Sequence, residues 1–337
     1  MNTSHRHPSL SIVVNNYNYA DYIGSALDSA LSQMNAADEL VIVDDGSTDN
    51  SLEILSAYSD VQAIRLIKQS NQGQMKAVRT GIAVADCDII VLLDSDDYFL
   101  EGYLDRLREI YHTDPDVSFA LSKADVIGEA SGKPAKMRRS LEKMTFPAGK
   151  IGPTRCATLM FYEFVGVPTS GISFRREFVN RILQIPEDVD QTVRLSPTLR
   201  RILGISLQEA NKNGFSADGV IVRCASALNE TKYYDDQPGF AYRIHGSNKF
   251  AAVPLWGRLY LRAYRKRQFI RLLVENFAIR NPPTTQELLE EIQQRSWPKH
   301  LFRRLRLRVQ YCLACAKTNG SFRQKVTTLA VGLGIVK

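Results

Sequence analysis

The sequence contains no apolar run that approaches the roughly eighteen residues needed to cross a bilayer. The longest candidate late in the chain, residues 329–336, is too short and contains two glycines. The first nine residues are polar, so no secretory signal is expected. Only five cysteines occur in 337 residues, which does not indicate a disulfide framework. Together these absences predict a reduced, cytoplasmic protein.

Signatures of common phosphate-binding and zinc sites are also missing. No Gly-x-Gly-x-x-Gly motif follows the first apolar segment, and the chain has no Walker-type loop. A bound diphosphate would therefore need a cation to neutralise much of its charge. Cys312 and Cys315 have Cys-x-x-Cys spacing, but neither a second pair nor a nearby histidine completes a zinc site. We expect these two thiols to be buried in a helical core.

Acidic side chains are scarce in the last quarter of the chain. Residues 255–337 carry a net charge of +13, whereas residues 1–254 carry −6. This asymmetry predicts an anionic partner, either nucleic acid or anionic lipid, with a solvated basic surface as the alternative. Residues 303–308 alternate arginine with leucine, and residues 262–271 are similar, with two aromatic residues. Such helices suit an anionic membrane surface, although a helical dimer contact or an acceptor clamp explains them equally well.

Short apolar runs alternate with helical patterns in the first hundred residues. We expect strands at 10–14, 39–43, 63–67 and 89–93, with helices at 21–33, 51–58 and 75–85 between them. This order predicts an α/β fold with a mostly parallel sheet flanked by helices. Further strands are expected at 119–127, 171–175 and 240–245, and helices at 177–183 and from residue 217. After residue 254 we expect basic helices, interrupted at Pro282-Pro283 and Trp297-Pro298.

Polar clusters follow three of the predicted strands. The segment Asp94-Ser95-Asp96-Asp97 comes directly after one strand, Asp44-Asp45 after a second, and Asn15-Asn16-Tyr17 after the first. Ligands of open parallel sheets bind beyond the carboxyl ends of the strands. Three carboxylates gathered there need a positive partner, and oxygen ligands favour Mg²⁺ or Mn²⁺. The alternative is a capped loop, because Asp and Ser are also common in turns.

These segments together resemble the family 2 glycosyltransferases of the GT-A fold. The resemblance is strong over residues 9–104 and rests on four pieces in the family's order: SIVVNNYNYADYIGSALDSALSQ, ELVIVDDGSTDNS, NQGQMKAVRTGIAVA and DIIVLLDSDD. It is weaker over 165–250, where PTSGISFRRE, SADG and YRIHGSN match later elements. It implies a donor-binding half at 1–125 and an acceptor-binding half at 126–253. Residues 254–337 would form a basic helical extension.

The resemblance implies a metal-dependent, inverting transfer of a sugar from a nucleotide-diphosphate donor, with a UDP-sugar expected. The acceptor would be a saccharide or lipid-linked saccharide of cell-surface polysaccharide synthesis, on the cytoplasmic side of the membrane. Mg²⁺ or Mn²⁺ would be the cofactor, and no nucleic acid is expected as a partner. The implied metal ligands are Asp96, Asp97 and His245. The implied donor-binding residues are Asn15, Tyr17, Asp45, Asn71, Gly73, Asp94, Ser95 and Asp96.

The general base is expected at Asp218, where the family usually has a Glu-Asp pair and this chain has Ala217-Asp218. Two alternatives stay open: Asp218 caps a helix over 219–228, or the base lies in Glu187-Asp188. Two other functions also stay open: a nucleotide-sugar-binding protein without transferase activity, and a nucleic-acid binder that uses the basic tail. The intact carboxylates disfavour the first, and the lack of a recognised nucleic-acid module disfavours the second.

Overall fold

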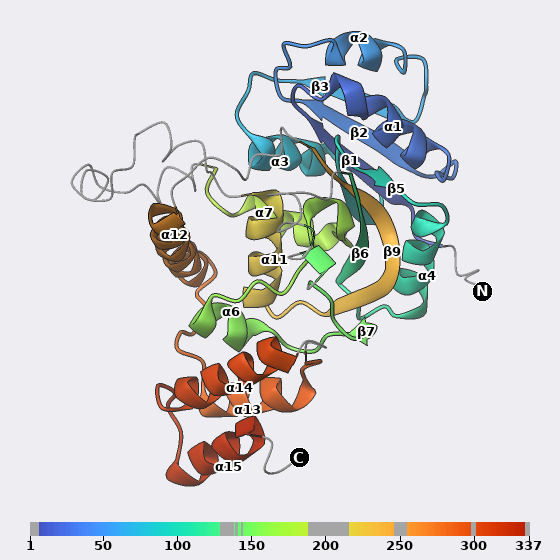
Figure 1. The fold of residues 1–337 in the computed structure, drawn as a ribbon. Coiled ribbons are helices and arrows are strands. Elements are labelled where there is room, and N and C mark those ends of the chain that lie inside the picture. The colour runs from blue at the N-terminus through green and yellow to red at the C-terminus, as the bar shows by residue number, and fades with distance from the viewer. Residues whose placement is uncertain are drawn as a thin grey trace.

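One mixed sheet with helices on both faces forms the body of the protein, and a group of C-terminal helices lies at one end (Figure 1). The computed structural model describes residues 7–128, 138, 141–142, 144–187, 216–245, 255–297 and 301–333. Within these residues the sheet has nine strands, and the order along it is β3-β2-β1-β4-β8-β6-β9-β5, with β7 paired to β9. The strands are β1 Leu10–Asn16, β2 Glu39–Asp44, β3 Ile64–Lys68, β4 Ile89–Asp94, β5 Tyr98–Phe99, β6 Phe119–Gly128, β7 Gly149–Lys150, β8 Ile172–Arg175 and β9 Lys232–Ile244.

The first four strands pair in parallel, as their alternation with helices predicted. Strand β8 is antiparallel to both of its neighbours, β4 and β6, so the sheet is mixed. The long pairings, including that of β6 with β9, are parallel. The predicted α/β fold class with a mostly parallel sheet is confirmed. Strand β6 crosses residue 125, where the boundary between two halves was expected, so one continuous sheet extends across that position.

Helices pack on both faces of the sheet. The described helices are α1 Ala20–Leu31, α2 Ser51–Ser56, α3 Gln74–Val84, α4 Tyr103–Thr113, α6 Arg155–Phe161, α7 Val179–Leu183, α11 Ala217–Ala227, α12 Leu255–Asn276, α13 Thr285–Gln294, α14 Leu301–Cys315 and α15 Phe322–Leu333, with 3₁₀ turns η1 Thr169–Gly171 and η2 Arg176–Phe178. Elements α4, α6, β5 and β7 were not predicted. Strands β5 and β7 have two residues each and α6 has seven, which is too short for a clear period. Helix α4 does have a helical period, with Tyr103, Leu104, Leu107, Arg108 and Tyr111 buried, and this pattern was missed.

The core has two layers, one on each side of the sheet. Val13 packs with α3, α7 and α11 on one face, whereas Ile12 and Val14 pack with α1 and α4 on the other. Successive side chains of a strand point to opposite faces, so a strand covered on both sides reads as a continuous apolar run. This is why residues 89–93 contain no polar side chain and residues 10–14 contain only one, Ser11, whose buried hydroxyl donates to Glu39 at 2.6 Å.

Strand β9 is much longer than predicted. The expected strand was 240–245, but β9 begins at Lys232 and includes Pro238. Its pairing with β6 shifts register between Ser122 and Ala124, opposite this proline. A bulge lets a strand accommodate proline, which cannot donate to the ladder, and the polar residues before Pro238 hid the strand's first half.

The C-terminal helices are not one uniform extension. Phe269 and Leu273 of α12 are fully buried in the main core. The sequence had suggested that residues 262–271 could lie on a membrane, but Phe269 is not available for such a contact. Helices α13, α14 and α15 instead form a separate cluster with α6 (Figure 1). No helix in the described residues is long and apolar enough to cross a membrane.

A buried polar network joins this helical cluster to the body. The two carboxylate oxygens of Glu291 accept hydrogen bonds from the backbone N–H groups of Cys156 and Ala157, at 2.6 and 2.9 Å, where α6 begins. Arg295 donates to the Tyr311 hydroxyl at 2.8 Å and to Glu163 at 2.9 Å. Because each buried charge has a partner, the network fixes α13 and α14 against α6.

Lys232 lies fully buried beside this network and gives the fold a specific pH dependence. Its ammonium group donates to Thr154 at 3.1 Å, to the Val165 carbonyl at 3.4 Å and to the Ser226 hydroxyl. Burial, and next the charge of Arg295, lowers the Lys232 pKa to about 7. In the unfolded chain this pKa is about 10.4. Between these values the unfolded state binds more protons, so stability should rise with pH, by up to about 1.4 kcal/mol per unit.

Urea unfolding of the wild type and of Lys232→Met between pH 7 and pH 10 measures this contribution. The difference in unfolding free energy, wild type minus variant, should increase with pH. Lys68→Met, which changes an exposed lysine of β3, should give a constant difference. A constant difference for Lys232→Met as well would contradict the prediction.

Candidate active site

The polar ends of β1, β2 and β4 meet at one edge of the sheet, as predicted. In the parallel register Asn16 lies opposite Asp44, and Asn15 lies opposite Asp94. The strands therefore deliver two acidic clusters and the Asn15–Tyr17 segment to a single place.

The turn after β2 is held by Asp44. Its carboxylate accepts hydrogen bonds from the Ser47 N–H at 2.9 Å, the Ser47 hydroxyl at 2.6 Å and the Asn16 side chain at 2.9 Å. Gly46 has φ +76°, and a Cβ there would lie 2.8 Å from the backbone nitrogen of Asn71. Glycine is therefore required, and it lets the loop before α3 pack directly on this turn.

Asp45 builds that loop from the other side. It is buried and accepts hydrogen bonds from the Gln69 side chain at 2.8 Å and from the N–H groups of Gln72 and Gly73 at 2.9 and 2.7 Å. A carboxylate has about four acceptor positions, so one remains for a ligand. Asn71 is exposed at the tip of the same loop. The structure thus brings Asp45, Asn71 and Gly73 together.

Asp94 lies at the end of β4 among amide side chains. Gln74, the first residue of α3, donates to it at 2.7 Å. Burial, and next the neighbouring Asp96, raises the Asp94 pKa to about 7, while hydrogen bonds from Gln74 and Asn15 act in the opposite direction. Sequence reasoning missed Gln74, although its position directly after the Asn71–Gly73 loop is a signal that it faces the same edge.

Asp97 ties three elements together. It is 1% exposed, and its carboxylate accepts from the Ser170 hydroxyl at 2.6 Å and from the Arg243 N–H at 2.9 Å. The Ser170 hydroxyl also accepts from the Asp94 N–H at 3.1 Å. Burial, and next Asp96 and Asp94, raises the Asp97 pKa well above its usual value. Both carboxylate oxygens of Asp97 therefore already accept hydrogen bonds that connect β4, η1 and β9.

Asp96 faces His245, which lies just beyond the end of β9. The histidine Nε2 is 3.0 Å from the Asp96 carboxylate, and both side chains are largely buried. The imidazole stacks on Tyr22 with a centroid distance of 4.9 Å and meets the edge of Tyr19 at 5.7 Å. The position of Tyr22 beside Ile23, Ala26 and Ala30 in the helical period would place it on the buried face of α1. It is half-buried, and its ring instead positions His245.

The carboxylates fit a divalent cation. One oxygen from each of Asp94, Asp96 and Asp97 lies within 4.8 Å of the others. Burial and mutual repulsion raise the pKa values of Asp94 and Asp97, so the cluster is electrostatically unfavourable until a positive charge compensates it. Hard oxygen donors are the ligands preferred by Mg²⁺ and Mn²⁺.

Asp218 lies in the first turn of α11, where Ser216 is the N-cap residue. The interpretation of Asp218 as the cap of a helix beginning at 219 is therefore wrong. Its carboxylate accepts from the Gly219 N–H at 2.7 Å, and burial raises its pKa. Burial and Asp96 are the larger causes of the raised Asp94 pKa, and the charge of Asp218 also contributes, so Asp218 lies near the acidic cluster.

The alternative location for the general base was Glu187-Asp188. The Glu187 side chain is 76% exposed and lies 4.0 Å from Arg79, and no described contact joins it to the acidic cluster. Asp188 is outside the described residues. Of the other predicted donor-binding residues, Tyr17 is half-buried. The buried Ser95 hydroxyl has no hydrogen-bond partner among the described residues.

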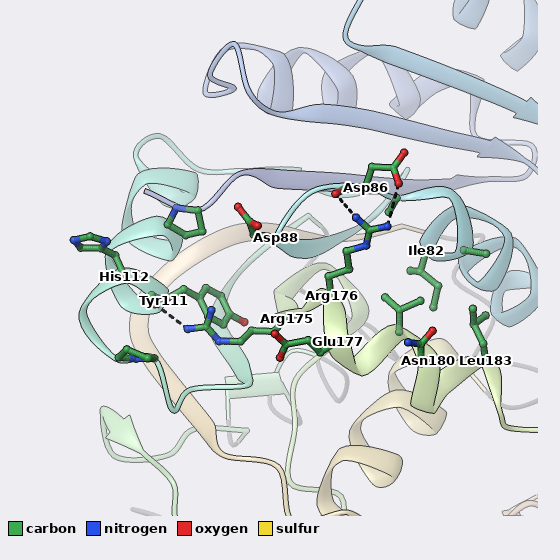
Figure 2. A pocket seen from close by; sticks show the side chains of 15 residues that line it. Ile82, Asp86, Asp88, Tyr111, His112, Arg175, Arg176, Glu177, Asn180 and Leu183 are labelled. Atoms are coloured by element: carbon green, nitrogen blue, oxygen red, sulfur yellow. Dashed lines mark hydrogen bonds and ion pairs between the residues drawn. The ribbon is translucent and has the colours of Figure 1, made fainter. Parts of the chain in front are cut away.

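A cavity of about 750 Å³ lies at the opposite ends of the strands (Figure 2). Asp86 and Asp88 precede β4, and Arg175 and Arg176 follow from the end of β8. The arginines hold the chain in place: Arg175 donates to the Tyr111 carbonyl at 2.9 Å, and Arg176 pairs with Asp86 at 3.1 Å. This cavity is separate from the acidic edge.

The chain is similar to known proteins over the strands that form this edge. A model of glycosyl transferase family 2 matches residues 11–183, half of the chain and all of the strands that form the acidic edge. The chain belongs to glycosyl transferase family 2. An uncharacterised glycosyltransferase of Nostoc sp. strain PCC 7120 is 30% identical to this family 2 chain over 248 residues. That match covers 71% of the chain and 66% of the relative.

Solved structures confirm the GT-A fold. Residues 1–349 of TarS from S. aureus, in complex with UDP-GlcNAc, match with a TM-score of 0.51 at 15% identity and cover 97% of this chain and 91% of theirs. A mannosyltransferase from Pyrobaculum calidifontis, in complex with GDP-Man and Mn²⁺, matches with a TM-score of 0.52 at 15% identity. That match covers 98% of this chain and 81% of the mannosyltransferase. At these identities the likeness concerns the fold.

Proposed function

We propose that this family 2 protein is an inverting, metal-dependent glycosyltransferase that uses a nucleotide-diphosphate sugar, with a UDP-sugar as the expected donor. The observation that carries the proposal is the gathering of Asp94, Asp96 and Asp97 within 4.8 Å at the strand ends. Asp218 of α11 lies near enough for its charge to act on Asp94. Similar folds in complex with UDP-GlcNAc, or with GDP-Man and Mn²⁺, support a donor of this class.

The donor would lie along the edge of β1, β2 and β4. We assign the nucleobase to Tyr17, Asp45 and the loop containing Asn71 and Gly73, because Asp45 keeps one acceptor position open beside that loop. The ribose and diphosphate would lie against Asn15, Asp94, Ser95 and Asp96.

Asp96, Asp97 and His245 would hold Mg²⁺ or Mn²⁺, which supplies positive charge to the leaving diphosphate when bound. Asp96 and His245 are the better placed of the three, because they face each other and Asp97 is committed to Ser170 and Arg243. Tyr22 and Tyr19 hold the imidazole in this orientation.

Asp218 would accept the proton of the acceptor hydroxyl. Its raised pKa makes it a stronger base than an exposed aspartate, and positioned proton transfer contributes on the order of 10²–10⁴ in rate. A single displacement inverts the anomeric carbon and needs no covalent nucleophile. The acceptor class we propose is a saccharide or lipid-linked saccharide of cell-surface polysaccharide synthesis, reached from the cytoplasmic side by a peripherally bound protein.

Titration of UDP-glucose with and without Mn²⁺ tests this function. We expect the nucleotide sugar to raise the thermal unfolding midpoint only when Mn²⁺ is present, because ligand-linked stabilisation grows with occupancy. We also expect slow release of UDP, which distinguishes a transferase from a protein that only binds nucleotide sugars. A panel of other nucleotide sugars identifies the base and sugar. Stabilisation by DNA or RNA, with no response to any nucleotide sugar, would overturn the proposal.

A further inference from the structure

Large apolar side chains reach the surface almost exclusively on two C-terminal helices. Within the described residues, ten such side chains are exposed, and Val61 is the one outside α14 and α15. The other nine are Leu301, Phe302, Leu305, Val309, Leu313, Phe322, Val326, Leu329 and Leu333. Phe302 is 76% exposed and Phe322 is 84% exposed. Concentrated apolar exposure of this kind marks an interaction surface.

On α14 the exposed apolar residues form one stripe. Leu305, Val309 and Leu313 recur every four residues, so they line one face of the helix. The buried residues Leu307 and Tyr311 lie on the opposite face, and Tyr311 packs against α13 and α6. The sequence run of alternating arginine and leucine is therefore divided, with Leu307 in the core and Leu305 on the surface.

On α15 the same pattern recurs. Phe322, Val326, Leu329 and Leu333 follow spacings of four, three and four residues, which places them on one helical face. Thr328, Val331 and Gly332 are buried on the other side of the helix. Both C-terminal helices thus carry an apolar stripe that no described residue covers.

Cations flank both stripes, and carboxylates are absent from this part of the chain. By helical geometry Arg306 and Arg308 lie on either side of the α14 stripe, and Arg323 and Lys325 lie on either side of the α15 stripe. The sequence has no Asp or Glu after Glu291, whereas residues 301–337 contain eight Lys and Arg. An apolar stripe between cations is the pattern of a helix that lies in a membrane interface.

We propose that the exposed stripes of α14 and α15 insert into the surface of an anionic lipid bilayer. The apolar side chains would enter the acyl boundary, and the flanking cations would contact anionic headgroups. A second copy of this chain is a poorer occupant, because joining two such surfaces would oppose cation to cation, and neither α14 nor α15 carries a carboxylate to compensate them. The inference specifies the peripheral association proposed above and does not depend on sugar transfer.

Flotation of the full chain with vesicles tests the proposal. Vesicles of phosphatidylcholine with about 30% phosphatidylglycerol should carry the protein, whereas pure phosphatidylcholine vesicles should bind it at least tenfold more weakly. Binding should also weaken as salt is raised, because screening reduces headgroup attraction. Equal binding to both vesicle types, or none to either, would overturn the proposal.

Matched variants separate the stripes from general surface properties. Phe302→Ser with Phe322→Ser should lower the vesicle partition coefficient about tenfold or more, because two exposed phenyl rings lose their apolar contact. Arg306→Gln with Arg323→Gln should lower it on phosphatidylglycerol vesicles by about fivefold for each charge removed. Val61→Ser removes an exposed apolar side chain elsewhere and should leave partitioning unchanged.

Two further readouts keep the result unambiguous. All variants should keep the wild-type thermal midpoint and the UDP-glucose response, since the changed side chains lie outside the acidic edge. Analytical sedimentation without lipid should show that the wild-type protein does not self-associate through this surface. Any self-association that is observed should persist in the phenylalanine variants. Self-association that these variants abolish, combined with unaltered vesicle binding in the same variants, would assign the surface to a second copy and refute membrane insertion.

Discussion

Asp218→Asn is expected to reduce the turnover number for sugar transfer by about 10²–10⁴ while leaving UDP-sugar binding within twofold of wild type. The substitution preserves the shape of the side chain and removes its basicity. Asp218 lies in the first turn of α11, and its charge acts on Asp94 at the end of β4. It is therefore placed to act on the acceptor without forming part of the sheet edge to which we assign the donor.

The measurement is the rate of UDP release with and without a hydroxyl acceptor, together with calorimetric donor affinity. Glu187→Gln is the matched control, because that carboxylate is 76% exposed and belongs to the rival pair. It should retain wild-type turnover, and Asp188→Asn should do the same. Near-normal turnover in Asp218→Asn, or a loss in the Glu187 or Asp188 variant instead, would refute the assignment of the base.

The sheet edge was predictable because strand and helix alternated clearly in the first hundred residues. Continuous apolar runs predicted strands covered on both faces, and the carboxyl ends of parallel strands must meet at one edge. The observed register, with Asn15 opposite Asp94 and Asn16 opposite Asp44, agrees with this expectation. The contributions of distant elements did not follow, since single-sequence patterns carry no information on long-range packing.

Gln74 and Ser170 show this limit for polar contacts. They come from α3 and η1, and they reach Asp94 and Asp97 through tertiary packing across 20 and 73 positions of the sequence. Tyr22 shows it for aromatic residues, because its helical spacing fits a core stripe and only the position of His245 gives its ring another partner. Periodicity identifies which face of a helix is covered, but not what covers it.

For the C-terminal helices, composition suggested a uniformity that the structure does not have. A uniform basic character suggested one extension, but burial divides it: α12 completes the main core through Phe269 and Leu273, while α14 and α15 keep apolar stripes outside. Charge composition is nearly the same in both parts. Only the positions of apolar side chains relative to the core distinguish a structural helix from one with a free face.

Asp96→Asn is expected to lower the affinity for Mn²⁺ by about a hundredfold or more and to abolish the metal-dependent part of donor binding. Replacing residues that only support a metal ligand already costs about 10–100-fold in affinity, so loss of a direct charged ligand should cost at least as much. The asparagine side chain keeps the size of the aspartate and can still bond His245, so the change isolates the carboxylate charge.

Calorimetric titration of the protein with Mn²⁺ alone provides a readout that does not require activity. Asp21→Asn, an exposed carboxylate at the start of α1, is the control and should bind Mn²⁺ as the wild type does. Asp97→Asn should weaken Mn²⁺ binding less than Asp96→Asn, and it should also lower the thermal midpoint, because its oxygens accept from Ser170 and Arg243. Wild-type Mn²⁺ affinity in Asp96→Asn would remove the central support for a metal-held diphosphate at this edge.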